Sequence, residues 1–279
     1  MNVSNIVIVG LGLIGGSLAK AFSKYTDCRV SGFDTDPATL EEALACGAIA
    51  KAGDADDLSH ADIVYLCLYP EADIHFVSSH LSSFTKDTIV TDVCGIKMEV
   101  SRGLCQLAEK GGFTYCGSHP MAGTEKHGFS ASRADLFKGA SYILVPCGAP
   151  ESVCELLRQT AFRLGFGRSV STTPEHHDQL IAFTSQLPHA LACAYVMSPR
   201  CPEHRGFSAG SYRDVSRVAN INEVMWSELF LDNRTALTEE LDIFLKNLTE
   251  IRDAVADNNH AHLETLLRKG RLIKEELGE

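Results

Sequence analysis

A glycine-rich turn near the N-terminus constrains the fold of this chain more than any other feature. Gly10, Gly12 and Gly15 form a G-x-G-x-x-G motif. It directly follows the apolar run 6–9 and opens a helical pattern over residues 15–25. In dinucleotide-binding βαβ units the first glycine permits the tight turn, the second lets the backbone approach a pyrophosphate, and the third allows close helix–strand packing. The motif and its flanks therefore predict such a unit at the start of the chain.

An acidic residue after the second predicted strand indicates which dinucleotide binds. Asp34 lies about 20 residues beyond the glycines, where a carboxylate accepts hydrogen bonds from the adenosine ribose hydroxyls. The same carboxylate would repel a 2′-phosphate, so we expect NAD rather than NADP. The alternative is a solvated turn acid beside the helix-capping Asp36. We also expect the amides of Leu13 and Ile14, at the positive end of the first helix, and the residue Tyr69 to contact the cofactor.

The first 171 residues alternate short apolar runs with helical patterns. The predicted strands are residues 6–9, 29–33, 63–68, 88–92, 113–117, 142–146 and 168–171. Helical patterns between them include residues 15–25, 37–46 and 97–110. Continuous apolar strands separated by helices indicate a mostly parallel sheet that is covered on both faces. The fold class predicted for residues 1–171 is therefore α/β, a doubly wound dinucleotide-binding (Rossmann) domain.

Residues 172–279 show a different pattern, with helical spacing of apolar residues and no strand-like alternation. Long helices are predicted over residues 174–197, 222–258 and 260–277. These helices carry more apolar surface than three helices can bury among themselves. We therefore expect an all-helical substrate and dimerisation domain that forms a homodimer. The alternative is a monomeric helical lid folded onto the first domain.

Charge and cysteine usage exclude several kinds of partner. The chain of 279 residues has 25 Lys+Arg against 36 Asp+Glu, a net charge of −11, which predicts no nucleic-acid or membrane partner. Neither a membrane-spanning run nor a signal peptide is recognisable, so we expect a cytoplasmic protein. The ten cysteines include no C-x-x-C pair, and we interpret most of them as reduced core residues rather than metal ligands.

Several side chains suited to acid–base and anion chemistry stand outside the glycine motif. His119 follows the predicted strand 113–117, and we expect it in a Gly/Pro-rich loop at the carboxyl edge of the sheet. There its imidazole could accept a hydroxyl proton as hydride leaves the same carbon. The alternative is a histidine that only ties down its own loop. His189 lies in an apolar helix, Arg213 and Arg217 are suited to capture of a carboxylate, and Trp226 is the only tryptophan.

With these residues in view, the sequence resembles the prephenate and arogenate dehydrogenases of tyrosine biosynthesis. The resemblance covers essentially the whole chain. The matching segments are residues 10–19, 90–97, 118–125, 187–189, 210–217 and 225–226. The Ser-His-Pro-Met-Ala-Gly-Thr-Glu run at 118–125 is the most specific, because dinucleotide-binding proteins in general do not share it.

The resemblance implies an NAD-dependent oxidative decarboxylation of a cyclohexadienol, prephenate, to 4-hydroxyphenylpyruvate. His119 looks like the family's catalytic histidine, bonded to the ring hydroxyl, and His189 like its second active-site histidine. Arg217 matches the arginine that binds a substrate carboxylate. Loss of the ring carboxylate as CO2 is then driven by aromatisation.

Further positions are carried over from the family, and two depart from it. Thr124 and Glu125 match loop positions near the substrate side chain. Trp226 matches a tryptophan that the helical dimer can contribute from the neighbouring subunit. Gly95 stands where many members have a serine that bridges substrate and nicotinamide. Gln186 stands where many have another histidine.

Three alternatives remain at this point. Arogenate, or both substrates, could be oxidised, because arogenate differs from prephenate only by an ammonium in place of the side-chain keto group. A β-hydroxyacid or imine reductase would need a lysine deep in the helical part, and residues 174–197 contain none. A non-catalytic NAD-binding protein is the third alternative, which the departures at Gly95 and Gln186 keep open.

Overall fold

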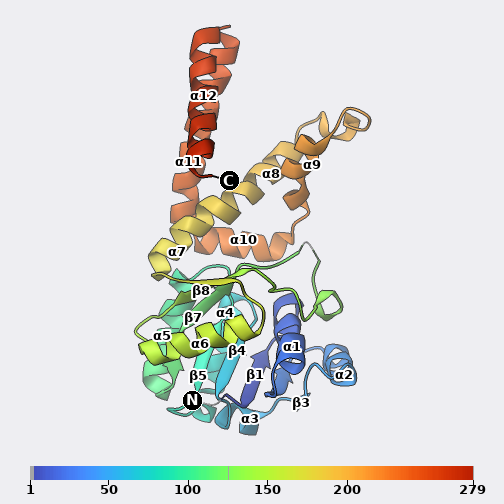
Figure 1. Cartoon of the computed structure of the whole chain (residues 1–279), viewed down its shortest axis with the longest axis vertical. Coiled ribbons are helices and arrows are strands. Elements are labelled where there is room, and N and C mark those ends of the chain that lie inside the picture. Colours follow the sequence, from blue (N-terminus) through green and yellow to red (C-terminus); the bar gives the residue numbers. More distant parts are fainter. Residues whose placement is uncertain (1–2, 125, 279) are drawn as a thin grey trace.

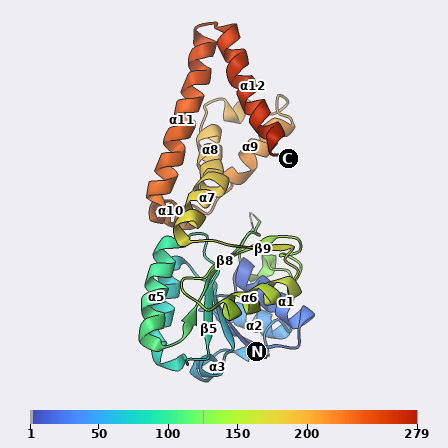
Figure 2. The same cartoon turned by 60° about the vertical axis from the view of Figure 1, so that its left-hand side comes forward.

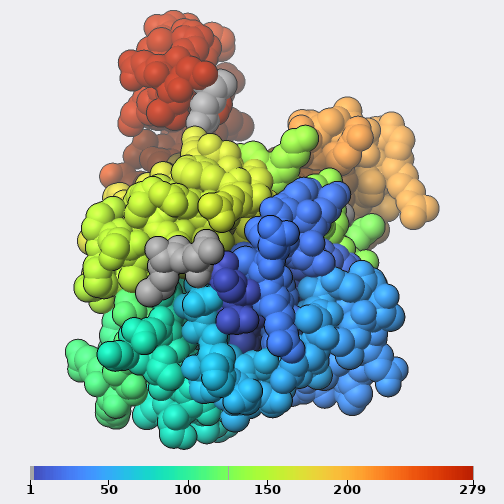
Figure 3. All heavy atoms as spheres, turned by 60° about the horizontal axis from the view of Figure 1, so that its bottom comes forward, coloured from blue at the N-terminus to red at the C-terminus, as the bar shows by residue number. Residues whose placement is uncertain are grey.

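The molecule has a lower part built on β-sheets and an upper part built from helices (Figure 1). The computed structural model describes residues 3–124 and 126–278. The chain passes from one part to the other after the strand β9 (Arg168–Ser171) and before the helix α7 (Pro174–Ile181). Seen from below, the sheet-containing part is a continuous packed body, and the last two helices project beyond its outline (Figure 3).

The main sheet has six parallel strands in the order β3-β2-β1-β4-β5-β6. The strands are β1 (Asn5–Val9), β2 (Arg29–Phe33), β3 (Lys51–Ala52), β4 (Ile63–Leu66), β5 (Ile89–Asp92) and β6 (Thr114–Tyr115). This is the strand order of a doubly wound Rossmann fold, in which ligands bind where the order reverses, between β1 and β4. The predicted fold class is confirmed. The sequence analysis did not predict the short edge strand β3.

Alternate side chains of β1 point to opposite faces of the sheet and begin two separate cores. Ile6 and Ile8 belong to one core, and Val7 and Val9 to the other. The first core is covered by α1 (Leu13–Tyr25), α2 (Pro37–Ala45) and α6 (Glu151–Arg163). The second is covered by α3 (Ala55–Ser59), α4 (Pro70–Ser79) and α5 (Met98–Gly111). Burial on both faces explains why these strands are continuously apolar.

The predicted strand 113–117 is in fact two strands in two sheets. The chain leaves the parallel sheet after β6, and β7 (Gly117–Pro120) starts a three-stranded sheet with β8 (Ser141–Val145) and β9. A Cβ on Gly117 would lie only 2.9 Å from the Tyr115 hydroxyl, so the glycine permits the close approach of this hydroxyl where the chain changes sheets. His119 therefore lies within β7, paired with Ile143 of the antiparallel β8, and the expectation that it sits in a loop was wrong.

The upper part is helical, as predicted. After α7 a π-helical turn (Ala182–Gln186) leads into α8 (Leu187–Val196). The remaining helices are α9 (Gly210–Ser216), α10 (Glu223–Asp232), α11 (Arg234–Ala256) and α12 (His260–Glu276). The predicted helix 222–258 is interrupted at Asn233, which separates α10 from α11. Helices α11 and α12 form an antiparallel hairpin that rises away from the sheets (Figure 2). No helix within the described residues is long and apolar enough to cross a membrane.

Candidate active site

The glycine turn has the geometry of a dinucleotide cradle. Gly10 has φ +88°, and a Cβ there would lie 2.8 Å from the Cys67 carbonyl oxygen. A Cβ on Gly15 would lie 1.8 Å from the Gly10 carbonyl oxygen, so only glycine lets the helix pack this close. A Cβ on Gly12 would meet no atom within 4 Å, so the space above this residue is open. No side chain caps the helix α1, which leaves its first amides available to an anion.

Asp34 lies beside this cradle at the carboxyl end of β2. One of its carboxylate oxygens accepts a hydrogen bond from the Leu11 amide at 2.8 Å, and the other from the Asp36 amide at 2.9 Å. These bonds orient the carboxylate and leave acceptor capacity for ribose hydroxyls. Tyr69 precedes α4 at the same edge of the sheet, and 43% of its surface is exposed. The predicted cofactor residues therefore gather along the carboxyl edge of the sheet.

A chain of three side chains runs from β7 to α7. His119 Nδ1 lies 2.9 Å from His177 Nε2, and His177 Nδ1 lies 2.7 Å from Asp178 Oδ1. The Asp178 carboxylate also accepts hydrogen bonds from the backbone amides of Lys97 (2.7 Å) and Met98 (2.8 Å), at the start of α5. Burial holds the pKa of His119 well below its usual value, and the nearby His177 and Lys97 act in the same direction. Burial also lowers the pKa of His177, an effect that Asp178 opposes.

A buried network supports the β5 end of this arrangement. The Lys97 ammonium forms an ion pair with Asp92, and both side chains are fully buried. Asp92 also accepts a hydrogen bond from the Tyr115 hydroxyl at 2.8 Å. The Ser118 hydroxyl donates to the Asp92 carbonyl at 2.7 Å, and Thr91 donates to Ser118 at 3.1 Å. These contacts hold β7, and with it His119, beside the carboxyl end of β5, the edge at which ligands of such sheets bind.

His189 and Trp226 meet in the helical part. Their rings stack with centroids 3.8 Å apart and an interplanar angle of 26°. His189 Nδ1 lies 2.8 Å from the Ser185 carbonyl oxygen, so this nitrogen carries the proton and Nε2 is left as the acceptor. Burial lowers the pKa of His189, and the charge of Arg217 contributes to the shift. Arg217 thus lies near His189, and no carboxylate of the described residues forms an ion pair with it. In this structure Trp226 contacts His189 of its own chain.

Gly95 and Gln186, the two departures from the family pattern, have different surroundings. A Cβ on Gly95 would lie 3.7 Å from the Leu229 side chain, an ordinary contact, so the position has room for a side chain. Gln186 is buried, and its amide donates to the Leu229 carbonyl at 2.8 Å while accepting from Asn233 at 2.7 Å. Gln186 therefore joins α10 and α11 to the π-helical turn.

Of the two predicted residues in the segment after β7, the structure describes Thr124. Thr124 is exposed in the segment after β7, where its hydroxyl accepts from the Lys126 amide at 3.3 Å. Glu125 lies outside the described residues.

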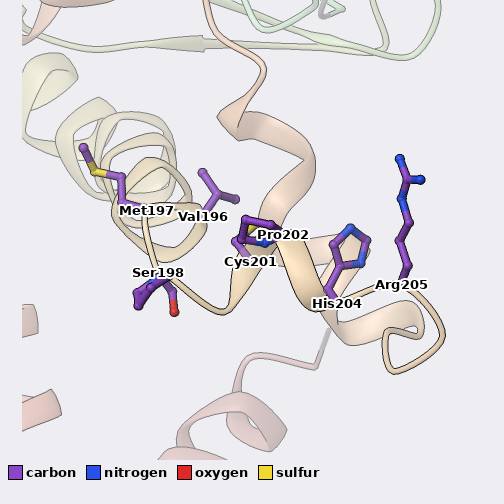
Figure 4. A pocket seen from close by; sticks show the side chains of 8 residues that line it. Val196, Met197, Ser198, Cys201, Pro202, His204 and Arg205 are labelled. Atoms are coloured by element: carbon purple, nitrogen blue, oxygen red, sulfur yellow. The ribbon is translucent and has the colours of Figure 1, made fainter.

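A surface hollow of about 710 Å³ lies at the carboxyl end of α8, lined by residues such as Met197, Pro202 and Arg205 (Figure 4). None of the predicted site residues lines this hollow.

The sequence analysis missed the groups that support His119. His177 and Asp178 stand in a His-His-Asp run just after the start of the helical part, which is a visible signal for acid–base chemistry. Lys97 and Asp92 lie in a segment that we used for the resemblance without assigning either residue a role. The segment 90–97 and the His-His-Asp run at 176–178 are far apart in the sequence and meet only in the folded chain.

A Rossmann fold with an open phosphate cradle, a histidine at its ligand-binding edge and an added helical part is the arrangement expected of a dinucleotide-dependent dehydrogenase. Comparison with known families makes the assignment narrower. The nucleotide-binding domain of prephenate dehydrogenase matches residues 18–161, and the prephenate dehydrogenase dimerization domain matches residues 173–269. The chain belongs to the prephenate dehydrogenase family and is an oxidoreductase of that family.

The relatives of this chain are named for different substrates. A cyclohexadienyl dehydrogenase of Zymomonas mobilis is 33% identical over 270 residues, which cover 93% of this chain and 91% of that protein. A prephenate dehydrogenase from A. aeolicus in complex with hydroxyphenyl propionate and NAD+ matches with a TM-score of 0.85 and 26% identity, over 99% of both chains. Synechocystis arogenate dehydrogenase matches with a TM-score of 0.82 and 26% identity, over 98% of this chain and 99% of that one.

Proposed function

We propose that this protein catalyses the NAD-dependent oxidative decarboxylation of prephenate to 4-hydroxyphenylpyruvate in tyrosine biosynthesis. The observation that carries the proposal is the position and state of His119. Its ring is held through Nδ1 beside the carboxyl end of β5, and its lowered pKa keeps it neutral near pH 7. A neutral imidazole at that edge can accept the proton of a ring hydroxyl.

The cradle fits a dinucleotide without a 2′-phosphate. Gly10, Gly12 and Gly15 would receive the pyrophosphate together with the first amides of α1, contributed by Leu13 and Ile14. Asp34 would bind the adenosine ribose, and Tyr69 would lie against the cofactor further along the edge. NAD, when bound, accepts a hydride from the substrate.

His119 accepts the proton of the C4 hydroxyl as the C4–H bond gives up its hydride. The C1 carboxylate then leaves as CO2, and the electron pair of the broken C–C bond completes the aromatic ring. The phenol oxygen takes the proton back from His119, so the reaction releases no net proton. Arg217, which has no carboxylate partner among the described residues, would bind a substrate carboxylate, with His189 and Trp226 beside it. Thr124 and Glu125 would flank the substrate side chain, and Gly95 would lie near the nicotinamide.

A dual-substrate enzyme is the second candidate function. It is favoured by the 33% identity to a cyclohexadienyl dehydrogenase and by the similarity to an arogenate dehydrogenase structure. Arogenate presents the same ring hydroxyl and ring carboxylate to His119. Discrimination between prephenate and arogenate would therefore depend on the few contacts that the protein makes to the side-chain keto or ammonium group.

We further infer a homodimer formed through the helical part. The match to a dimerization domain supports it. So do the apolar side chains that α11 and α12 leave exposed, among them Leu245 (55%), Val255 (59%) and Leu267 (57%). An exposed apolar surface of this kind is typical of a subunit interface.

The test is an assay of NADH formation with prephenate and arogenate measured side by side, together with CO2 release. We expect turnover of prephenate, and the ratio of the two kcat/KM values decides between the candidates. His119→Asn should reduce kcat by about 100-fold or more while NAD still binds, since a positioned general base contributes on that scale. NAD binding without turnover of either substrate would indicate a non-catalytic protein instead.

A further inference from the structure

The hydrogen bonds around His119 have a direction that the Asp178 carboxylate determines. A carboxylate has no hydrogen to donate, and both oxygens of Asp178 already accept backbone amides, from Lys97 and Met98. His177 Nδ1, 2.7 Å from the same carboxylate, must therefore carry a proton and donate it. In a neutral His177 the other ring nitrogen, Nε2, is then an acceptor.

The same argument continues to His119. Its Nδ1 lies 2.9 Å from His177 Nε2, so this Nδ1 must be the donor. A neutral His119 that is protonated on Nδ1 has an unprotonated Nε2. This nitrogen makes none of the hydrogen bonds found among the described residues, so its lone pair is available to a ligand.

We propose that His177, oriented by Asp178, is a positioning residue that holds His119 in the Nδ1-protonated tautomer required of the catalytic base. The inference rests on the proposed function of His119. Without such a partner, a neutral histidine can carry its proton on either nitrogen, and the Nε2-protonated form could not accept from the substrate hydroxyl.

The arrangement also provides for the charge that forms during the reaction. When His119 Nε2 takes the hydroxyl proton, the positive charge on His119 lies one hydrogen bond away from His177 and two from the Asp178 carboxylate. The Lys97 ammonium nearby would oppose this charge, but Lys97 is paired with Asp92 in the buried network. His119 can therefore hold the proton for the time between hydride transfer and its return to the phenol oxygen.

The first test needs no substrate. NMR of 15N-histidine-labelled enzyme distinguishes protonated from unprotonated ring nitrogens, and single histidine variants assign the signals. We expect both His119 and His177 to be protonated on Nδ1 in the wild type. Protonation of His119 on Nε2 would overturn the proposal, whether or not the enzyme turns over prephenate.

A matched pair of variants provides the second test. In His177→Gln the side-chain oxygen can still accept from His119 Nδ1, while in His177→Leu nothing can. We expect kcat for prephenate to fall by about 100-fold in His177→Leu and by less than about 10-fold in His177→Gln, with the KM for NAD unchanged in both. An equal fall in kcat in the two variants would contradict the proposal.

The two tests separate this inference from the proposed function. The expected tautomers together with no turnover of either substrate would refute the function and leave the positioning geometry in place. Turnover together with the opposite tautomer would refute the positioning role alone. If His177→Leu does not fold, the wild-type NMR measurement still decides the question.

Discussion

At the scale of single residues, burial changes the chemistry of Asp73. Its carboxylate is fully buried and accepts hydrogen bonds from the Leu68 amide at 3.1 Å and the Cys94 thiol at 3.2 Å. Burial, reinforced by the charge of Asp92, raises the pKa of Asp73 from 3.8 to about 7. Since the folded state holds this proton more tightly than the unfolded chain does, rising pH destabilises the folded state between pH 4 and about 7.

Asp73→Asn should remove this pH dependence. The amide oxygen can keep the bond from Leu68, and no charge needs to be buried at high pH. A change in pKa from 3.8 to about 7 corresponds to about 4 kcal/mol, so the variant should gain up to that much relative to the wild type between pH 4 and pH 8. Urea unfolding at several pH values measures the difference. A difference that does not change with pH would contradict the prediction.

Gly95 allows a test of the serine that the resemblance to the family places at this position in many members. The nearest atom to an added Cβ is 3.7 Å away, so Gly95→Ser should fold normally. A hydroxyl that hydrogen-bonds the substrate is worth about 1 kcal/mol, so the KM for prephenate should fall by about fivefold. Gly95→Ala is the matched control, because it adds the same Cβ without the hydroxyl. The same KM in both variants would show that the hydroxyl makes no such bond.

At the scale of elements, one buried asparagine joins three helical segments. The Asn233 amide donates to the Asp178 carbonyl at 2.9 Å and to Gln186 Oε1 at 2.7 Å, between α10 and α11. It thereby connects α7, the π-helical turn and the start of α11. The interruption of the predicted helix 222–258 falls at this residue, whose backbone (φ −106°, ψ 26°) departs from helical geometry.

Asn233→Ala should destabilise the protein by about 2 to 4 kcal/mol, because two buried acceptors lose a donor. The control is Asn222→Ala. Asn222 is exposed and caps α10 by accepting from the Met225 amide at 3.1 Å, and loss of such a cap costs about 1 kcal/mol. Chemical denaturation at a fixed protein concentration compares the two variants. Equal losses would mean that the buried bonds contribute no more than an exposed cap.

At the scale of the whole molecule, the helical part exposes apolar residues that a second copy could cover. On α11 they include Leu245 and Leu248, which are one turn apart and are 55% and 49% exposed. Leu248→Glu should therefore weaken the proposed dimer. Asn247→Glu is the matched control, since it adds the same charge at the neighbouring exposed position of the helix.

Sedimentation velocity over a range of concentrations measures the effect. We expect the dimer dissociation constant to rise at least 100-fold in Leu248→Glu, since burying a charge in an apolar interface costs several kcal/mol. Asn247→Glu should leave the constant within about threefold of the wild type. Equal dissociation constants for the two variants would show that the dimer interface does not include Leu248.

Much of the lower part could be predicted, because its signals are local. The run 6–9, the glycine turn and the following helix form consecutive units whose patterns can be read from neighbouring residues. The division of the predicted strand 113–117 could not be predicted in this way. Where the chain changes sheets, a Cβ on Gly117 would lie 2.9 Å from the Tyr115 hydroxyl and 3.3 Å from a carboxylate oxygen of Asp92, and Asp92 is brought there by the fold.

The amino-acid sequence by itself determined the class of fold and the cofactor cradle, since the positive φ of Gly10 and the close approach of Gly15 to the Gly10 carbonyl involve residues within one short segment of the chain. It also singled out His119. Only the tertiary structure decided what state His119 is in. Its partner His177 is 58 positions away, and the amide of Lys97 that orients Asp178 is 81 positions from it. The proton positions of a histidine depend on the donors and acceptors that surround it in space, and those neighbours are assembled by folding.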